Sequence, residues 1–145
     1  MKVLIDTNLL FSAIIKPDGK IAEIILNSNF DLKIYGCYFS YIELFRHKDK
    51  ILKLSKLDET ELLEIIYQVI KKIEFFNEEQ IPEAYFKNAF NLTFDVDEKD
   101  TVFIAMANYL KYPLWSGDLK LIEGLRKKEY HNILNTNELL AFLGK

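Results

Sequence analysis

The chain has 145 residues, of which half are hydrophobic, 14% are aromatic and 28% are charged, and its net charge is −3. This length fits one domain spanning residues 1–145, and the composition supplies a sizeable core and excludes an intrinsically disordered chain. The acidic balance excludes a strongly basic protein that coats nucleic acid, so any contact with a nucleic acid must come from local patches.

Cys37 is the single cysteine, so the chain has no internal disulfide, and its cysteine and histidine spacing does not fit a zinc site. We expect a buried thiol there. The apolar run at the start is too short for a signal peptide, and no uncharged apolar stretch approaches the length of a membrane span. The sequence therefore predicts a cytoplasmic protein.

Apolar patterning and turn signals predict strands that alternate with helices. In chain order we expect a strand at residues 2–5, helices at 8–15 and 21–26, a strand at 32–35, helices at 40–54 and from 58 to about 73, a less clear segment at 74–93 with a helix from Pro82, a helix at 97–110, a strand at 114–115, a helix at 119–127, a short edge strand at 133–134 and a helix at 137–143. Thr136 is the expected cap of the last helix. This order favours a three-layer α/β/α domain with a central, mostly parallel sheet of four or five strands.

Four acidic residues stand where such a fold gathers ligand-binding groups. Asp6 follows the first strand, Glu43 lies about one turn into the helix after the second strand, Asp100 opens a helix, and Asp118 follows the strand at 114–115. The carboxyl ends of parallel strands share one edge, so these side chains can converge. Clustered carboxylates raise their own pKa values or bind a cation, and oxygen ligands suit Mg²⁺ or Mn²⁺. Such a centre is typical of phosphodiester chemistry.

Each acid also has a structural explanation when it is taken alone. Asp6 and Asp118 are suited to cap the helices that follow them. Glu43 can pair with Arg46 three residues later. Asp97 is explained as an acidic residue at a helix start, where the helix dipole favours it.

The ordered combination of motifs resembles the PIN-domain ribonucleases, particularly the VapC-type toxins. The matching segments are Ile5-Asp6-Thr7-Asn8, Ser40-x-x-Glu43, Asp97-x-x-Asp100 with the apolar helix after it, Leu114-Trp115-Ser116-Gly117-Asp118, and the closing Asn135-Thr136-Asn137-Glu138. They extend over essentially the whole chain. The region at about 56–94 matches no motif of the family.

The resemblance implies a PIN-like fold and an endoribonuclease that hydrolyses RNA with Mg²⁺ or Mn²⁺. Asp6, Glu43, Asp100 and Asp118 would then be the catalytic, metal-binding acids. Ser116 matches a frequent Ser or Thr of the family that orients a carboxylate, a water or a phosphate. With Asn8 it is an expected substrate-binding residue. The resemblance also implies the toxin of a toxin–antitoxin pair, with a small antitoxin as partner; a homodimer is a further expectation.

Other classes of function have less support in the sequence. An aspartyl-phosphate phosphatase needs a second Asp where this chain has Asn8. His47 and His131, the two histidines, lie in charged runs that favour solvated surfaces over a metal-independent ribonuclease. A non-catalytic domain that binds a partner through apolar surface remains the alternative. Self-association or antitoxin binding is expected through exposed apolar surface of the N-terminal helices and of the aromatic middle region, not through the acidic edge.

Two basic clusters begin near the acidic edge. They are Arg46, Lys48, Lys50, Lys53 and Lys56, and then Lys120, Arg126, Lys127 and Lys128. A contact track for a phosphate backbone and ordinary solubilising charge both fit this pattern. For the second cluster, solubilising charge is the favoured interpretation.

Overall fold

The computed structural model describes residues 1–144, in which short strands form one sheet between helices. The strands are β1 (Lys2–Ile5), β2 (Lys33–Cys37), β3 (Ile73–Phe76), β4 (Leu114–Trp115) and β5 (Ile133–Leu134). Across the described residues the sheet has five strands in the order β3-β2-β1-β4-β5, and every neighbouring pair is parallel. This confirms the expected fold class.

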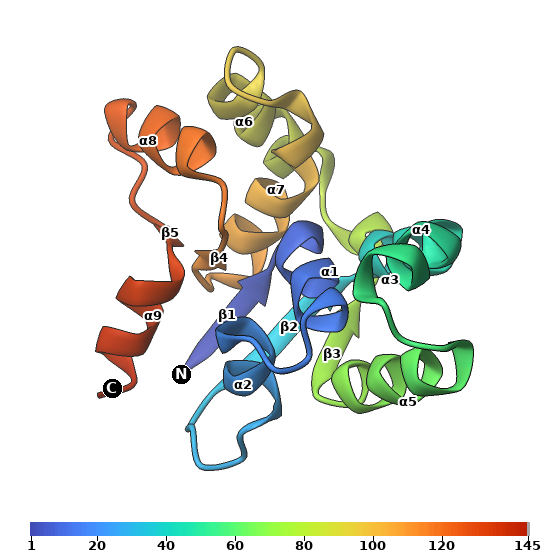
Figure 1. Cartoon of the computed structure of the whole chain (residues 1–145). Helices are drawn as coiled ribbons and strands as arrows, with labels where there is room; N and C mark the ends of the chain where they lie inside the picture. Colours follow the sequence, from blue (N-terminus) through green and yellow to red (C-terminus); the bar gives the residue numbers. More distant parts are fainter. Residues whose placement is uncertain (145) are drawn as a thin grey trace.

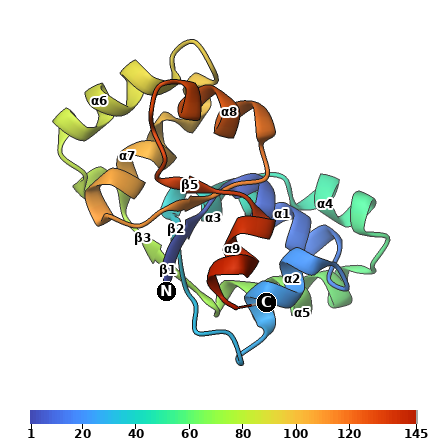
Figure 2. The ribbon, with the colours of Figure 1, turned by 90° about the vertical axis from the view of Figure 1, so that its left-hand side faces the viewer.

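Helices cover both faces of the sheet. They are α1 (Thr7–Ile15), α2 (Lys20–Leu26), α3 (Tyr38–Arg46), α4 (Lys48–Ser55), α5 (Glu59–Ile70), α6 (Glu83–Thr93), α7 (Thr101–Leu110), α8 (Leu119–Lys127) and α9 (Thr136–Phe142), with 3₁₀ turns η1 (Glu78–Gln80) and η2 (Glu98–Asp100). Figure 1 shows α1 and α2 in front of the sheet. Figure 2 shows α6, α7 and α8 grouped on one side of it, with α1, α2, α5 and α9 on the other.

The strands are buried on both faces, as expected for a covered parallel sheet. Val3 and Ile5 pack in the core shared with α1, α2 and α5, whereas Leu4 between them packs in the core shared with α7 and α8. Likewise, Trp115 packs in the core with α1, α2 and α5, and Leu114 packs in the core with α7 and α8. Since successive side chains of a strand point to opposite faces, two-residue strands suffice to anchor both layers.

The segment that the sequence left unclear contains the edge strand. Ile73 was expected on the apolar face of a helix, but α5 ends at Ile70 and Ile73 instead pairs with Ile34 of β2. The next residues of β3 continue this pairing, and α6 follows η1. Sheet pairing therefore overrides an apolar spacing that also fits a helix.

Two helix ends also differ from the expectation. The helix expected at 40–54 is divided at His47, whose φ of −104° and ψ of 17° end α3 and begin α4. The last helix is capped by Asn135, not by Thr136. Asn135 accepts the backbone N–H of Glu138 while the Glu138 carboxylate accepts the N–H of Asn135, so that the capping box forms one residue earlier.

The expected exposed apolar surface lies on the middle helices, chiefly α3 but also at Phe90 and Phe94, and not on the N-terminal helices. Leu9, Leu10 and Ile14 of α1 are buried in the core, as are Ile24 and Ile25 of α2. The large apolar side chains that α3 exposes are Tyr38, Phe39, Tyr41, Ile42 and Phe45. Within residues 1–144, no helix has the length and hydrophobicity that a membrane span requires.

Candidate metal centre

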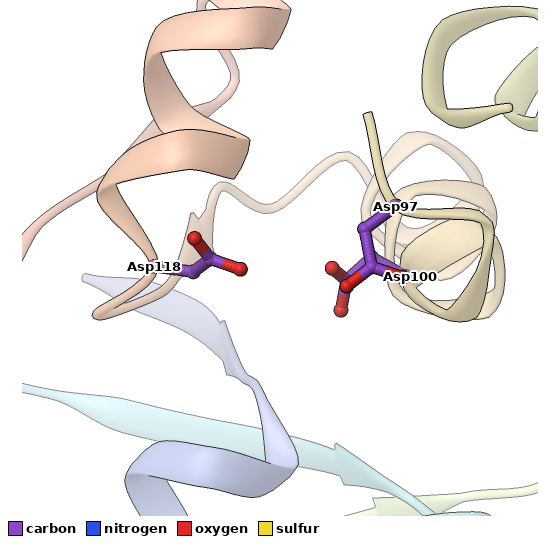
Figure 3. A group of neighbouring side chains, drawn as sticks. All are labelled: Asp97, Asp100 and Asp118. Carbon is purple, nitrogen blue, oxygen red and sulfur yellow. The ribbon is translucent and has the colours of Figure 1, made fainter. Parts of the chain in front are cut away.

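Three carboxylates from two separate segments meet at one edge of the sheet. Asp97 and Asp100 lie at the ends of the stretch that forms η2, and Asp118 lies directly before α8. One carboxylate oxygen of each falls within 4.8 Å of the others (Figure 3). Asp118 points across the gap toward the other two. The sequence prediction that distant acids converge therefore holds for Asp100 and Asp118.

Asp6 lies at the end of β1 and is buried beside this group. Its Oδ1 accepts the backbone N–H of Leu9 at 2.8 Å, so the expected helix cap is present. Burial raises the pKa of Asp6, the nearby charge of Asp118 adds to the rise, and hydrogen bonds from Ser116 and two backbone amides oppose it. The side chain is thus a cap and also an electrostatic neighbour of the cluster.

The pKa of Asp100 is raised well above its usual value. Burial raises it from 3.8 to about 7, and the charges of Asp97, Asp6 and Asp118 add to the rise. A buried carboxyl group whose pKa is raised further by three neighbouring acids is better accommodated with a cation beside it. This electrostatic strain is the expected signature of a functional site.

Asp97 combines two roles that the sequence interpretation kept apart. Its Oδ1 accepts the backbone N–H of Lys99 at 3.1 Å, as expected of a cap. It also belongs to the carboxylate group with Asp100 and Asp118. The assignment of Asp97 to capping alone was therefore incomplete. Its spacing of three residues from Asp100 is the signal that could have included it.

Ser116 forms hydrogen bonds with both Asp6 and Asp118. Its Oγ accepts the backbone N–H of Asp118 at 3.1 Å and donates to the carboxylate of Asp6. Asp118 in turn caps α8 through Oδ1, which accepts the N–H of Leu121 at 3.1 Å. Ser116 is fully buried. Of the roles expected for it, this geometry favours the orientation of carboxylates.

Glu43 lies on the wall of a cleft of about 930 Å³ that Asp6, Asp97 and Asp100 also line. It is not one of the three acids grouped within 4.8 Å. Its Oε1 accepts a hydrogen bond from Arg46 at 3.3 Å, which is the expected pair, and its Oε2 accepts one from His47 at 3.0 Å. Glu43 therefore shares the cleft while Arg46 and His47 hold its carboxylate.

His47 was expected on a solvated face, and its side chain is 44% exposed, but it also makes contacts at the candidate site. Besides its contact with Glu43, its ring meets Phe11 edge-on at a centroid distance of 6.2 Å, and it lines the cleft. The spacing of four residues from Glu43 would have indicated a shared helix face. The break between α3 and α4 at His47 hid that relationship from the sequence pattern.

The first two motif segments are joined by a hydrogen bond that the sequence did not indicate. Thr7 Oγ1 and Ser40 Oγ lie 2.6 Å apart, and Ser40 Oγ also lies 3.3 Å from the sulfur of Cys37. Cys37 is buried as expected, and burial raises the pKa of its thiol. These contacts fix the start of α3, and hence Glu43, relative to the end of β1.

The rim of the cleft carries polar and basic groups. Asn8 is exposed and lines it, with Lys50 and Lys99. In the second basic cluster, Arg126 pairs with Glu138, and Lys128 is occupied by a contact described below. In the first cluster, Arg46 and Lys48 are likewise paired, with Glu43 and Glu59, and Lys50 is the member that lines the cleft.

The chain matches the PIN domain family over residues 4–138. It belongs to the PIN-domain family. This assignment confirms the resemblance seen in the motifs. No curated protein matches the sequence significantly.

Two solved structures share this PIN-domain fold. A chain of VapBC2 from Rickettsia felis, solved bound to a DNA fragment from its promoter, superposes with a TM-score of 0.63 at 15% identity, over 93% of this chain and 98% of that one. PAE2754 from Pyrobaculum aerophilum superposes with a TM-score of 0.65, also at 15% identity, over 99% of this chain and 98% of that one. At this identity the likeness shows the fold alone.

Proposed function

We propose that this PIN-domain protein is a Mg²⁺- or Mn²⁺-dependent endoribonuclease, and that Asp6, Glu43, Asp100 and Asp118 form its active site together with Asp97. The observation that carries the proposal is the convergence of Asp97, Asp100 and Asp118 within 4.8 Å beside buried Asp6. Membership of the PIN family, whose members are generally nucleases, supports it.

The donor set fits a hard divalent cation. The grouped ligand atoms are carboxylate oxygens from Asp97, Asp100 and Asp118, with neither sulfur nor imidazole among them. Mg²⁺ and Mn²⁺ prefer such oxygens and retain water in the remaining positions. An open cleft beside the cluster leaves room for those waters and for a phosphate. Asp97, Asp100 and Asp118 would hold the ion, with Asp6 beside them.

A bound divalent ion supplies an acidified water and withdraws charge from the phosphate. The chain's own groups position the reactants. Ser116 keeps Asp6 and the Asp118 loop in place, and Glu43, held by Arg46 and His47, faces the cleft as an acceptor that orients the attacking water. Lys50 and Lys99 on the rim attract the phosphate backbone. Asn8, exposed on the same rim, is our proposed polar contact to the substrate.

The reaction needs no ribose 2′-OH, and this gives a direct test. Labelled RNA and a single-stranded DNA of the same sequence are incubated with the protein in Mg²⁺, in Mn²⁺ and in EDTA. We expect cleavage of RNA that EDTA abolishes, with no 2′,3′-cyclic phosphate ends. Cyclic ends, or cleavage that persists in EDTA, would exclude this mechanism.

We also propose a small antitoxin as partner, in keeping with a toxin of the VapC kind acting in the cytoplasm. The fold likeness to a VapBC2 chain supports this proposal. Tyr38, Tyr41 and Ile42 of α3 line a shallow apolar groove of about 310 Å³ with Phe75. Exposed apolar surface of this kind favours association. Light scattering at high concentration tests the rival occupant, a second copy of the chain, and a strictly monomeric protein would exclude the homodimer.

A non-catalytic, partner-binding PIN domain remains the second candidate, because the same α3 groove would serve it. The two candidates differ at the acidic cluster. In a domain that has lost catalytic activity, several carboxylates whose charges repel one another would be destabilising without any function. Absence of cleavage on a panel of structured and unstructured RNAs, with Mn²⁺ bound, would favour this candidate.

A further inference from the structure

The two segments that carry the acidic cluster also touch each other away from the carboxylates. Asp118 is the N-cap of α8, and Asp97 ends the segment 94–97 that leads from α6 to η2. Gly124 within α8 and Lys128 directly after it contact this same segment. The spacing of the carboxylates is therefore coupled to how closely α8 packs against residues 94–97.

Gly124 allows the close approach. A Cβ atom at this position would lie 2.9 Å from both Cγ1 and Cγ2 of Val96, a distance that real Cβ atoms essentially never show. Glycine within a helix is unfavourable, and only proline is worse. Its presence inside α8 is explained by the contact with Val96. Any side chain at position 124 would push α8 and the segment apart.

Lys128 secures the end of this contact. Its Nζ donates to the backbone oxygen of Leu92 at 3.0 Å and to the carboxylate of Asp95, and it lies 5.2 Å from the ring centroid of Phe94. The ammonium group holds the pKa of Asp95 below its usual range. One side chain thus contacts the end of α6 at Leu92 and two residues, Phe94 and Asp95, of the segment that leads to Asp97.

A displacement of residues 94–97 by α8 also moves Asp97, because the side of this segment that faces away from α8 is anchored on Thr93. The backbone N–H groups of Val96 and Asp97 both donate to the carbonyl oxygen of Thr93, at 3.0 and 2.9 Å. Thr93 is buried, and its Oγ1 lies 2.7 Å from that of Thr101 at the start of α7. Val96 and Asp97 are adjacent residues anchored on one oxygen, so a shift of Val96 moves Asp97.

We propose that Gly124, Val96 and Lys128 are positioning residues that set the spacing between Asp118 and Asp97, and thereby the affinity of the site for a divalent metal ion. We call this set of contacts the α8 brace. The proposal rests on the proposed function for the identity of the ion, while the spacing itself is a property of the fold. The brace residues touch neither the metal nor the substrate.

Calorimetric titration with Mn²⁺ tests the effect on the site. Gly124→Ala and Lys128→Met should each weaken Mn²⁺ binding about tenfold or more, as losses in the supporting shell of a metal site do. Adding Val96→Ala to Gly124→Ala removes both clashing Cγ atoms and should restore most of the affinity. Lys128→Arg, which keeps the charge and donors, should bind nearly as the wild type does.

Arg126→Met is the matched control, because Arg126 lies on the same helix but pairs with Glu138 of α9. It can lower the melting temperature without touching residues 94–97, so its Mn²⁺ affinity should stay that of the wild type. Equal Mn²⁺ affinity of Gly124→Ala, Lys128→Met and the wild type would overturn the proposal. So would a double variant no better than Gly124→Ala, or an equal loss in Arg126→Met.

A distance measurement needs no metal and separates this proposal from the proposed function. Spin labels at Glu98→Cys and Lys120→Cys, both exposed positions, report the separation of η2 and α8, and the native Cys37 is buried. We expect one narrow distance distribution, which Lys128→Met broadens or shifts and Arg126→Met does not. An unchanged distribution in Lys128→Met would refute the brace even if Mn²⁺ binds. Absence of Mn²⁺ binding by the wild type would refute the proposed function and leave the brace to be decided by this distance.

Discussion

The side chain of His47 donates to the carboxylate of Glu43, with Nε2 lying 3.0 Å from Oε2. The two residues are four apart, at the point where α3 ends and α4 begins. The break in the helix therefore places a ring beside Glu43, which, like Asp6, stands outside the group of Asp97, Asp100 and Asp118. Glu43 reaches the cleft as a carboxylate oriented by its neighbours.

His47→Ala should lower the rate of RNA cleavage about tenfold, because a carboxylate without its outer partner is less well oriented. His47→Gln can still donate through its amide, so its loss should be smaller. Single-turnover cleavage rates measure both. His131→Ala is the control, since His131 is exposed and contacts only Glu129 among the ion pairs seen in residues 1–144. Equal RNA cleavage rates for His47→Ala and His131→Ala would show that His47 does not act by orienting Glu43.

Asp97→Asn should weaken Mn²⁺ binding about tenfold or more. The amide oxygen of asparagine can still accept the N–H of Lys99, so the substitution keeps the cap and removes the charge. Calorimetric titration separates the two explanations of this residue. Glu98→Gln, at an exposed neighbouring position, should bind as the wild type does. If Asp97→Asn binds Mn²⁺ normally, Asp97 is a cap alone.

Asp100 should make the stability of the metal-free protein depend on pH. Its pKa is raised from 3.8 to about 7 in the folded state, so the folded protein binds more protons than the unfolded chain between these values. The free energy of unfolding should therefore fall as pH rises from about 4 to about 7 and level off above, by linkage. Denaturant unfolding in EDTA at several pH values measures this.

In Asp100→Asn this part of the pH dependence should disappear, and the variant should be more stable than the wild type at pH 8. The reason is that asparagine removes a charge that burial and three neighbouring acids disfavour. If the free energy of unfolding depends on pH in the same way in the wild type and in Asp100→Asn, the pKa of Asp100 is not raised.

Mn²⁺ should raise the melting temperature of the wild type but not that of Asp6→Asn. Binding to the folded state alone stabilises by about 2.7 kcal/mol when the free ion is at a hundred times its Kd. Asparagine keeps the hydrogen bond that caps α1, so the variant should fold. Asp18→Asn, exposed and distant in sequence from the acidic segments, is the control and should respond as the wild type does. An equal shift in Asp6→Asn would show that Asp6 takes no part in holding the metal.

The parts of the fold that depend on local patterning could be predicted from the sequence. Apolar runs that end at Asp6 and just before Asp118 identified β1 and β4, and the carboxyl-edge rule brought Asp100 and Asp118 together. The edge strand β3 was missed because the spacing of Ile73 also fits the preceding helix. Its place is decided by pairing with β2, which local pattern does not encode.

The site was predicted less completely than the fold, for a physical reason. A cap and a metal ligand use the same carboxylate, so Asp97 looked fully explained by its helix end. His47 looked solvated because its partner lies across a helix break. The contact of Gly124 with Val96 joins residues 28 apart, which only the packing of α8 against residues 94–97 brings together. Tertiary contacts of this kind leave no local signal.

We propose that the acidic cluster hydrolyses RNA with a divalent ion. This proposal is tested most directly by incubating labelled RNA with wild type and Asp100→Asn, purified in parallel, in Mn²⁺ and in EDTA. We predict cleavage by the wild type in Mn²⁺, none in EDTA, and a rate lower by orders of magnitude for Asp100→Asn, with the fold intact by circular dichroism. Cleavage by Asp100→Asn at the wild-type rate in saturating Mn²⁺, or by the wild type in EDTA, would contradict it.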